Sequence, residues 1–277
     1  MSVGNKISVT EYEYLSDRVP LSFDGFRIAA VSDLHCNEIG KDNEILINRI
    51  KELKPDIILC AGDMVTDHSK NMDVVIRLFE RLSKEFDIYY SCGNHELKLG
   101  INKRTHSLYR RYRRRLGSLG VNYLNNKSAY ITRGNEKLRI AGLNIKRIYY
   151  KKMRMHKAVM PENYIRRLIG KANEEEFNIL LAHNPEYFNM YANWQADIVI
   201  SGHVHGGMVV LPYIGGVISP SLKLFPYYDF GEYKKKHSTM YLSRGLGSHT
   251  IPVRIFNPPE IMSITLRRRS NGNTCKT

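Results

Sequence analysis

Five short apolar runs, each ended by polar residues, constrain what this chain can fold into. The runs are residues 26–33, 56–61, 87–92, 177–183 and 196–202. Each has the length and character of a strand that is buried on both faces. Residues 43–53 and 72–82, which separate the first three runs, carry apolar side chains at helical spacing. Strands that alternate with helices are typical of βαβ units, so the sequence predicts an α/β fold with parallel strands.

The pattern changes beyond the third run. An arginine-rich helix is predicted over 101–119, and two runs around the turn at 133–136 predict a hairpin. A further helix is predicted near 161–173, and Gly/Pro turns separate short strands in the last third of the chain. The predicted hairpin strands are 128–133 and 137–143, and the short strands are 207–211, 238–243, 251–256 and 260–267. We expect one domain over 1–277, with a core at about 24–266, a basic polar tail at 267–277, and two packed sheets covered by helices on both outer faces.

The chain has a formal net charge of +15, which favours anionic partners. Phosphorylated small molecules, nucleic acid and an anionic membrane surface all fit, and a merely solvated basic surface is the simpler alternative. The first 25 residues hold no apolar run of signal-peptide length, and no stretch reaches 18 consecutive apolar residues. No two of the four cysteines have C-x-x-C spacing. We therefore expect a cytoplasmic protein, with peripheral membrane contact left open.

The residues that follow the five apolar runs are of the types that bind metal ions. In open α/β sheets, ligands bind beyond the carboxyl ends of the strands, so these side chains are predicted to share one pocket. Any single segment is more simply read as a turn or as a hydrogen-bonded structural histidine. Five such segments in order are hard to produce by turn chemistry alone. The predicted ligands are Asp33, His35, Asp63, Asn94, His183, His203 and His205.

The chemical types of these ligands limit which metal ions they would bind. Carboxylate, imidazole and amide oxygen without thiolate suit manganese, iron, zinc or cobalt. Seven ligands are too many for one tetrahedral ion. They fit two ions that share a bridging carboxylate and lie about 3.5–4 Å apart.

The series D-x-H, GD, GNHE, a later His and G-H-x-H resembles the calcineurin-like metallophosphoesterases over about residues 24–266. The C-terminal segments resemble the YkuE/YaeI-like phosphodiesterase branch of that family in bacteria. Val204 and Met208 depart from the branch, in which Thr and Gln are common at these positions, and neither is a ligand position. The segments are GHVHGGM, LPYIGGVISP, LFPYYDFGEY, YLSRGLG and IPVRIFNPPEIMSITL.

The resemblance implies a four-layer α/β/β/α sandwich of two mixed sheets. It also implies that Asp33, His35 and His205 hold one ion, that Asn94, His183 and His203 hold the other, and that Asp63 bridges both. A hydroxide held between the ions would attack phosphorus in line.

His95 and Glu96, which follow Asn94, each have two predicted roles. By the same resemblance, His95 would face the substrate as the catalytic group, which stabilises the transition state or protonates the leaving oxygen. A structural hydrogen-bond donor is the alternative for His95. Glu96 either orients His95 or a ligand, or is a surface carboxylate at a helix start.

These residues predict a metal-dependent phosphoric ester hydrolase that cleaves a phosphodiester or pyrophosphate bond in a small-molecule or lipid-linked substrate. A nuclease is the main alternative, although the chain has no recognisable nucleic-acid-binding module. A protein phosphatase and a non-catalytic scaffold on the same fold are less favoured, the scaffold because all seven ligand positions hold suitable residues. The oligomeric state and the metal in each position are not predicted.

Two basic stretches, 103–115 and 146–157, are free of acidic residues. They could bind nucleic acid or anionic lipid, or they could form a solvated face and a loop. We expect the 146–157 connection to help capture the substrate, with Tyr149, Tyr150 and Met153 either beside the pocket or packed on the core. No individual residue is predicted to bind the substrate.

Overall fold

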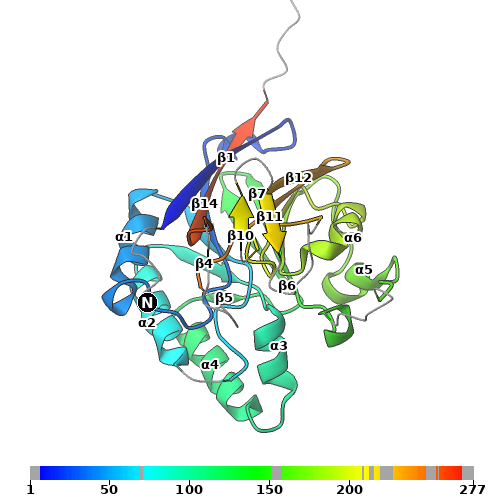
Figure 1. Cartoon of the computed structure of the whole chain (residues 1–277). Helices are drawn as coiled ribbons and strands as arrows, with labels where there is room; N and C mark the ends of the chain where they lie inside the picture. Colours follow the sequence, from blue (N-terminus) through cyan, green and yellow to red (C-terminus); the bar gives the residue numbers. More distant parts are fainter. Residues whose placement is uncertain are drawn as a thin grey trace, which may run out of the picture.

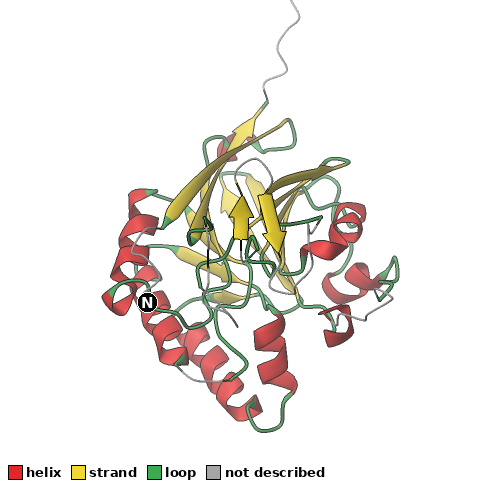
Figure 2. Ribbon diagram, viewed as in Figure 1, coloured by secondary structure: helices red, strands yellow, loops and turns green. Residues whose placement is uncertain are grey.

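The computed structural model describes residues 7–68, 71–150, 158–207, 209–211, 215–218, 227–247, 254 and 256–269. Its strands form two six-stranded sheets and one two-stranded hairpin. The two large sheets face one another in the interior, and helices cover the outer face of each (Figures 1 and 2).

The first sheet has the strand order β1-β14-β2-β3-β4-β5. Strands β2 to β5 run parallel, while β14 is antiparallel to β2 and parallel to β1. Helices α1 (Glu44–Glu52) and α2 (Met72–Leu82) connect the parallel strands, as the periodicity predicts. The strands are β1 (Ser8–Ser16), β2 (Arg27–Val31), β3 (Ile57–Cys60), β4 (Asp87–Tyr90), β5 (Asn122–Tyr123) and β14 (Glu260–Arg268).

The second sheet has the order β12-β13-β9-β8-β7-β6, and its four central strands are parallel. Its strands are β6 (Lys127–Arg133), β7 (Glu136–Leu143), β8 (Phe177–Ala182), β9 (Ile198–Ser201), β12 (Gly231–Lys235) and β13 (Ser238–Leu242). Helices α5 (Tyr164–Ile169) and α6 (Phe188–Asn193) belong to this half, and β10 (Val209–Leu211) and β11 (Gly215–Ile218) form the separate hairpin.

Alternation along the buried strands creates three apolar layers. In β2, Ile28 and Ala30 point into the core between the sheets, whereas Ala29 and Val31 contact the core under α1 and α2. The third core lies between the second sheet and helices α5 and α6. Because helices and sheets enclose three cores in turn, the predicted four-layer α/β/β/α sandwich of two mixed sheets is confirmed.

The predicted helix 101–119 corresponds to α4 (His106–Ser118), and a separate helix that was not predicted, α3 (Asn94–Ile101), precedes it. Helix α3 begins at the GNHE segment itself. The chain then turns at residues 102–105, and α4 returns along α3 with Tyr109 packed against Gly100. The arginine-rich helix therefore starts at His106, five residues later than predicted.

Several edge features were not predicted or lie outside the described residues. Strands β1 and β12 are half-exposed edge strands that carry charged residues, so they lack the apolar run of a buried strand. Strand β14 continues to Arg268, inside the predicted tail. Most of the predicted strand 251–256, residues 151–157 with Met153, and Met208 lie outside the described residues. The single-domain boundaries stay a prediction.

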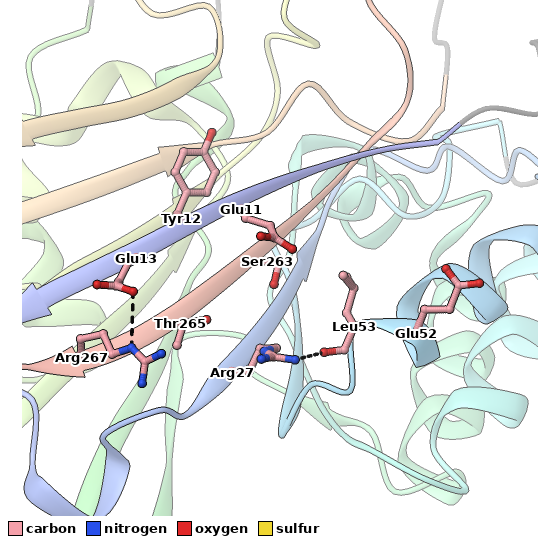
Figure 3. Close-up of a pocket in the computed structure, with 9 residues that line it drawn as sticks. All are labelled: Glu11, Tyr12, Glu13, Arg27, Glu52, Leu53, Ser263, Thr265 and Arg267. Atoms are coloured by element: carbon pink, nitrogen blue, oxygen red, sulfur yellow. Dashed lines mark hydrogen bonds and ion pairs between the residues drawn. The ribbon is translucent and has the colours of Figure 1, made fainter.

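The outer surface of the first sheet carries a hollow of about 400 Å³ near the amino end of β2 (Figure 3). Its charges are mixed, and Arg267 Nε lies 3.4 Å from Glu13 Oε2. Arg27, the first residue of β2, also lines it. Since Asp33 follows the opposite end of this strand, the hollow is separate from the predicted metal pocket.

Candidate metal centre

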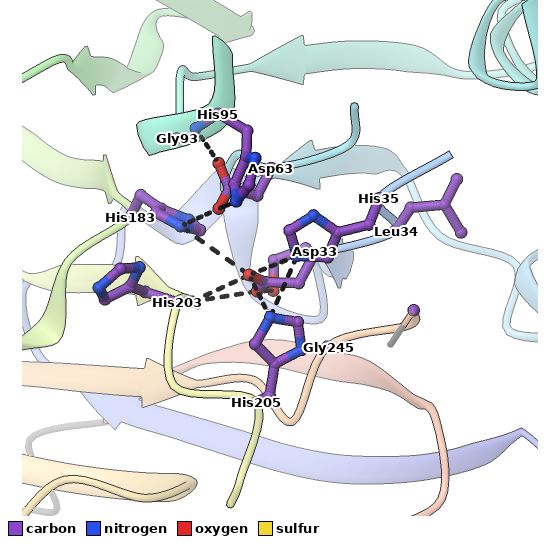
Figure 4. A network of polar contacts seen from close by, with 12 residues as sticks. Asp33, Leu34, His35, Asp63, Gly93, His95, His183, His203, His205 and Gly245 are labelled. Atoms are coloured by element: carbon purple, nitrogen blue, oxygen red, sulfur yellow. Dashed lines mark hydrogen bonds and ion pairs between the residues drawn. The ribbon is translucent and has the colours of Figure 1, made fainter. Parts of the chain in front are cut away.

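The loops after β2, β3, β4, β8 and β9 bring the predicted ligands of both sheets together (Figure 4). Three groups have their potential ligand atoms within 4.8 Å of one another: Asp33, His35 and His205; Asp63, His183 and His203; and His35, Asp63 and His95. His203 is half-buried, and the other members are buried. The first two groups, called the Asp33 triad and the Asp63 triad below, lie side by side.

The Asp33 triad surrounds a small space. The Nε2 atoms of His35 and His205 face each other at 3.1 Å. They lie 3.7 and 3.4 Å, respectively, from Asp33 Oδ1. Asp33 itself is held by the Ser32 hydroxyl, which donates to Oδ2 at 2.6 Å, and by the backbone N–H of His203 at 3.1 Å from both carboxylate oxygens. These contacts fix the carboxylate and leave two imidazole nitrogens directed at the space beside it.

The Asp63 triad has a similar construction. His183 Nδ1–H donates to the carbonyl of Ala61 at 2.8 Å, so Nε2 is free to face Asp63 Oδ2, 3.0 Å away. A histidine whose second nitrogen is fixed by a carbonyl is the usual arrangement of a metal-binding imidazole. His183 Nε2 also lies 3.8 Å from Asp33 Oδ1, so this ring joins the two triads.

The backbone at these positions is strained. The φ angles of Asp33 (55°), His35 (51°), Asp63 (52°), His203 (77°) and His205 (54°) all lie in the left-handed region. This conformation costs a non-glycine residue roughly 1–3 kcal/mol and concentrates at functional sites. Five such residues around one space indicate that the loops are shaped to aim these side chains inward.

Two glycines make room for the carboxylates. A Cβ atom at Gly93 would lie 2.2 Å from Asp63 Oδ1, and one at Gly202 would lie 2.2 Å from Asp33 Oδ2. Neither distance can exist in a real structure, so each carboxylate occupies the space that a side chain would fill.

Replacing Gly93 by alanine is expected to displace the Asp63 carboxylate and to lower metal content and turnover together. Gly117→Ala is the matched control, because Gly117 lies on α4 with no atom within 4 Å of the added Cβ. Metal analysis and hydrolysis rates of both variants test this. Unchanged metal content and turnover in Gly93→Ala would show that the close approach does not matter.

Asn94 is the seventh predicted ligand. It is buried at the first position of α3, between Gly93 and His95. Its Oδ1 atom is buried and accepts no hydrogen bond from any residue that the structure describes. A buried amide oxygen left without a donor is costly, and a metal ion would satisfy it.

His95 is backed by an acidic residue that the sequence analysis missed. The backbone N–H of Asp67 donates to His95 Nδ1 at 3.1 Å, and Asp67 Oδ1 lies 3.1 Å from the same atom. Lys98 pairs with the other carboxylate oxygen of Asp67 at 2.9 Å. His95 Nε2 points toward Asp63, with Oδ2 3.9 Å away. Asp67, the second Asp in GDMVTD, is the only sequence feature that could have indicated this contact, and a single acidic residue in a loop is too common to predict one.

Glu96 is not a surface carboxylate. It is fully buried and accepts hydrogen bonds from the backbone N–H groups of Asp63, Met64 and Gly93, each at 2.9 Å. The Tyr90 hydroxyl also donates to it. Of the two predicted roles, the orienting one is therefore correct: Glu96 ties the loop that carries Asp63 to the start of α3.

The charges of the two triads are strongly coupled. Burial alone would raise the pKa of Asp33 and of Asp63, but the neighbouring histidines outweigh burial and hold both pKa values below their usual range. Burial lowers the pKa of His205 to about 3 and that of His203 to about 4. Ionised carboxylates and the neutral imidazoles of His203 and His205 are in the protonation states that bind metal ions. At His183 the charges of Asp63 and Asp33 outweigh burial and raise the pKa to about 10, so a metal ion would displace a proton from this ring.

Tyr149 and Tyr150 belong to a short 3-10 helix, η3 (Arg147–Tyr150). The ring of Tyr150 lies against His203 and His183, with centroids 5.4 and 6.3 Å apart. Tyr149 packs instead on Tyr164 and Tyr187 in the outer core. Of the two predicted alternatives, a place beside the pocket therefore holds for Tyr150, and packing on the core holds for Tyr149.

The fold and the two triads define a class of protein: a metal-binding hydrolase built on an α/β/β/α sandwich. A model of the calcineurin-like phosphoesterase family matches residues 26–207, and this chain belongs to that family. Family members hydrolyse phosphate esters, and together with the Asp/His groups this membership indicates a metal centre.

Individual relatives extend over most of the chain. It is 28% identical to the uncharacterized metallophosphoesterase YkuE of Bacillus subtilis over 271 residues, which cover 94% of this chain and 86% of YkuE. It is 26% identical to an uncharacterized metallophosphoesterase of Aquifex aeolicus over 272 residues, or 96% of this chain and 94% of that one. The predicted resemblance to the YkuE-like branch is confirmed.

A solved structure, the phosphopantetheinyl hydrolase PptH from Mycobacterium tuberculosis, aligns with a TM-score of 0.45 and 11% identity over 79% of this chain and 89% of that one. Similarity at this level gives no indication of the substrate. Among the described residues, no helix is long and apolar enough to cross a membrane.

Proposed function

We propose that this protein hydrolyses a phosphodiester or pyrophosphate bond with the help of two metal ions. The observation that carries the proposal is the pair of triads, which lie side by side and are joined by His183. One triad alone would suffice for a single ion, and the second has no evident structural purpose. Burying imidazoles and carboxylates costs free energy, so such a cluster does not stabilise a core by itself.

The residues fit the metals that the sequence analysis names. Asp33, His35 and His205 would hold one ion, and Asn94, His183 and His203 the other. Asp63 and His35 each belong to two of the three groups, and of the two only Asp63 has a carboxylate, whose two oxygens could contact two ions. When bound, the ions would polarise the phosphoryl group and make a water nucleophile available near neutral pH. The set of nitrogen and oxygen donors suits manganese, iron or zinc.

His95 would supply the proton for the leaving oxygen. Because the N–H of Asp67 donates to Nδ1, the neutral ring carries its proton on Nε2, the atom that faces the carboxylate pocket. A donor at that position can hydrogen-bond the substrate and then protonate the oxygen that departs. Asp67 and Lys98 would act as positioning residues, since they touch His95 or its partner and not the pocket.

Hydrolysis of a diester, as against a monoester, rests on the resemblance of the C-terminal segments to the phosphodiesterase branch. A small-molecule or lipid-linked ester is the proposed substrate. The basic residues of α4 are largely exposed, among them Arg110, Arg111 and Arg114. Nuclease activity is the second candidate, favoured only by this exposed charge, and would appear as cleavage that weakens steeply with salt.

A direct comparison tests the proposed function. We expect the purified protein to hydrolyse bis(p-nitrophenyl) phosphate at a higher kcat/KM than p-nitrophenyl phosphate. We also expect activity to disappear after chelation and to return with Mn²⁺, Fe²⁺ or Zn²⁺. A preference for the monoester would contradict the bond type, and turnover that survives complete chelation would contradict the metal-dependent reaction.

A further inference from the structure

Two arginines that the proposed function does not use lie on the His205 side of the centre. Arg244 follows β13, and its Cγ would be 3.1 Å from a Cβ atom at Gly206, the residue after His205. The side chain of Arg254 donates through Nη2 to the carbonyl of Gly247. The N–H of Gly247 in turn donates to the carbonyl of Asp33 at 2.7 Å. The Arg254 guanidinium is therefore linked to the backbone of Asp33 through a single intermediate residue, Gly247.

Arg244 lies beside one carboxylate, although its buried Nε has no hydrogen-bond partner among the described residues. Its backbone N–H donates to Glu260 Oε2 at 2.9 Å, and its Nε lies 3.7 Å from Glu260 Oε1. Its guanidinium also lies over the ring of Phe230, 3.8 Å from the centroid. Glu260 is buried, and its Oε1 also accepts a hydrogen bond from the Thr10 hydroxyl.

Arg254 feels the charges of Asp33 and Glu260, but it forms no ion pair with a carboxylate of the described residues. Its Nη1 atom is buried and has no hydrogen-bond partner among the residues that the structure describes. Burial lowers the pKa of Arg254 to about 10, which still leaves the group cationic at neutral pH. The nearest carboxylate triad would be neutralised by metal under the proposed function. A buried cation beside bound cations is costly unless an anion joins it.

We propose that Arg254, with Arg244 beside it, binds a second phosphoryl group of the substrate. This inference rests on the proposed function and deepens it: the substrate would be a pyrophosphate diester. One phosphoryl group would lie at the triads, and its neighbour would face the guanidinium. A planar guanidinium presents its N–H groups in a fork that matches two phosphate oxygens, so it suits this task better than a lysine.

The reaction balances without any further reactant. The oxygen of one water forms a bond to the phosphorus at the triads, and the bond from that phosphorus to the bridging oxygen breaks. The bridging oxygen leaves with the phosphoryl group at Arg254, whose guanidinium neutralises the new negative charge. The two protons of the water end on the two products, which are both phosphate monoesters.

A matched pair of substrates tests the proposal. Bis(p-nitrophenyl) phosphate and di(p-nitrophenyl) pyrophosphate share their aryl groups and differ in the second phosphoryl group. We expect Arg254→Gln to lower kcat/KM for the pyrophosphate by about tenfold to a hundredfold, the loss that one charged hydrogen bond carries. On the simple diester the same variant should lose at least tenfold less kcat/KM than it loses on the pyrophosphate. Parallel losses on both substrates, or no loss on either, would overturn the proposal.

Two further variants guard against unfolding and general charge effects. Arg254→Lys keeps the charge without the fork, so an intermediate loss confined to the pyrophosphate is expected, and equal effects on both substrates would count against the proposal. Arg267→Gln is the control for net charge, because Arg267 is 45% exposed in the remote hollow of Figure 3. It should behave as the wild type on both substrates.

A binding measurement does not depend on turnover. Titration calorimetry on the metal-loaded protein should show methylenediphosphonate, a stable pyrophosphate analogue, binding more weakly to Arg254→Gln than to the wild type, with inorganic phosphate unaffected. Equal binding of the analogue would overturn the inference. A wild type that cleaves the simple diester but not the pyrophosphate would overturn the inference and leave the proposed function standing, whereas cleavage of neither would remove both.

Discussion

Replacing Asp63 by alanine is expected to lower kcat for phosphodiester hydrolysis by about a thousandfold or more. The carboxylate contacts His183 Nε2 at 3.0 Å and accepts the backbone N–H of His95 at 2.8 Å. Its removal would take a ligand from both proposed metal positions and would loosen the start of α3. A metal centre contributes several kcal/mol of transition-state stabilisation, and each 1.4 kcal/mol is tenfold in rate.

The matched control for this variant is Asp87→Ala. Asp87 is an exposed carboxylate at the first position of β4, in the same sheet but at the opposite end from the pocket. Its removal should leave kcat and metal content unchanged. Steady-state rates on bis(p-nitrophenyl) phosphate and the thermal midpoints of both variants provide the comparison. Near-normal turnover in Asp63→Ala would mean that the triads are not the reaction centre.

Replacing His95 by alanine is expected to lower kcat by about a hundredfold to ten-thousandfold, which is the range for a lost general acid. The ring lies 3.9 Å from Asp63 through Nε2 and is held by Asp67 through Nδ1. It is outside the two triads, so both ions should stay bound. A loss of turnover without a loss of metal is the signature that separates a catalytic role from a ligand role.

His237→Ala controls for the general effect of removing a histidine, because His237 is exposed in the turn between β12 and β13. It should match the wild type in rate and in metal content. If His95→Ala kept both ions and near-full turnover, His95 would be a structural hydrogen-bond donor. If it lost metal, the residue would have to be counted among the ligands.

The parts of the fold that could be predicted are those in which local pattern decides the structure. Strands β2, β3, β8 and β9 are mostly apolar because nearly all of their residues are buried on both faces, and their runs stand out in the sequence. Strand β1 was missed because it is a half-exposed edge that alternates polar and apolar side chains. The break between α3 and α4 was missed because packing of Tyr109 on Gly100, a tertiary contact, sets it.

In the metal centre, too, local sequence patterns predicted some features, whereas tertiary contacts determine the others. Residues at strand ends were identified because the topology of parallel strands brings their carboxyl ends together. Several contacts join segments that are far apart in the chain or lie inside loops: the edge-to-face contact of Tyr150 with His203, the pairing of Asp67 with His95 and the hydrogen bond from Arg254 to the Gly247 carbonyl. No periodicity encodes such contacts. The strained backbone at Asp33 and His205 could not be predicted either, because no sequence pattern identifies a non-glycine residue that adopts a positive φ angle.

The central claim is that the two triads hold two metal ions that the reaction requires. The most direct test is the metal content per chain, measured by mass spectrometry on the purified protein and on Asp63→Ala, together with the hydrolysis rate of the same samples. We expect about two metal ions per active wild-type chain, and a clear loss of both metal content and hydrolysis rate in Asp63→Ala. An active wild-type chain that holds no stoichiometric metal would contradict the central claim.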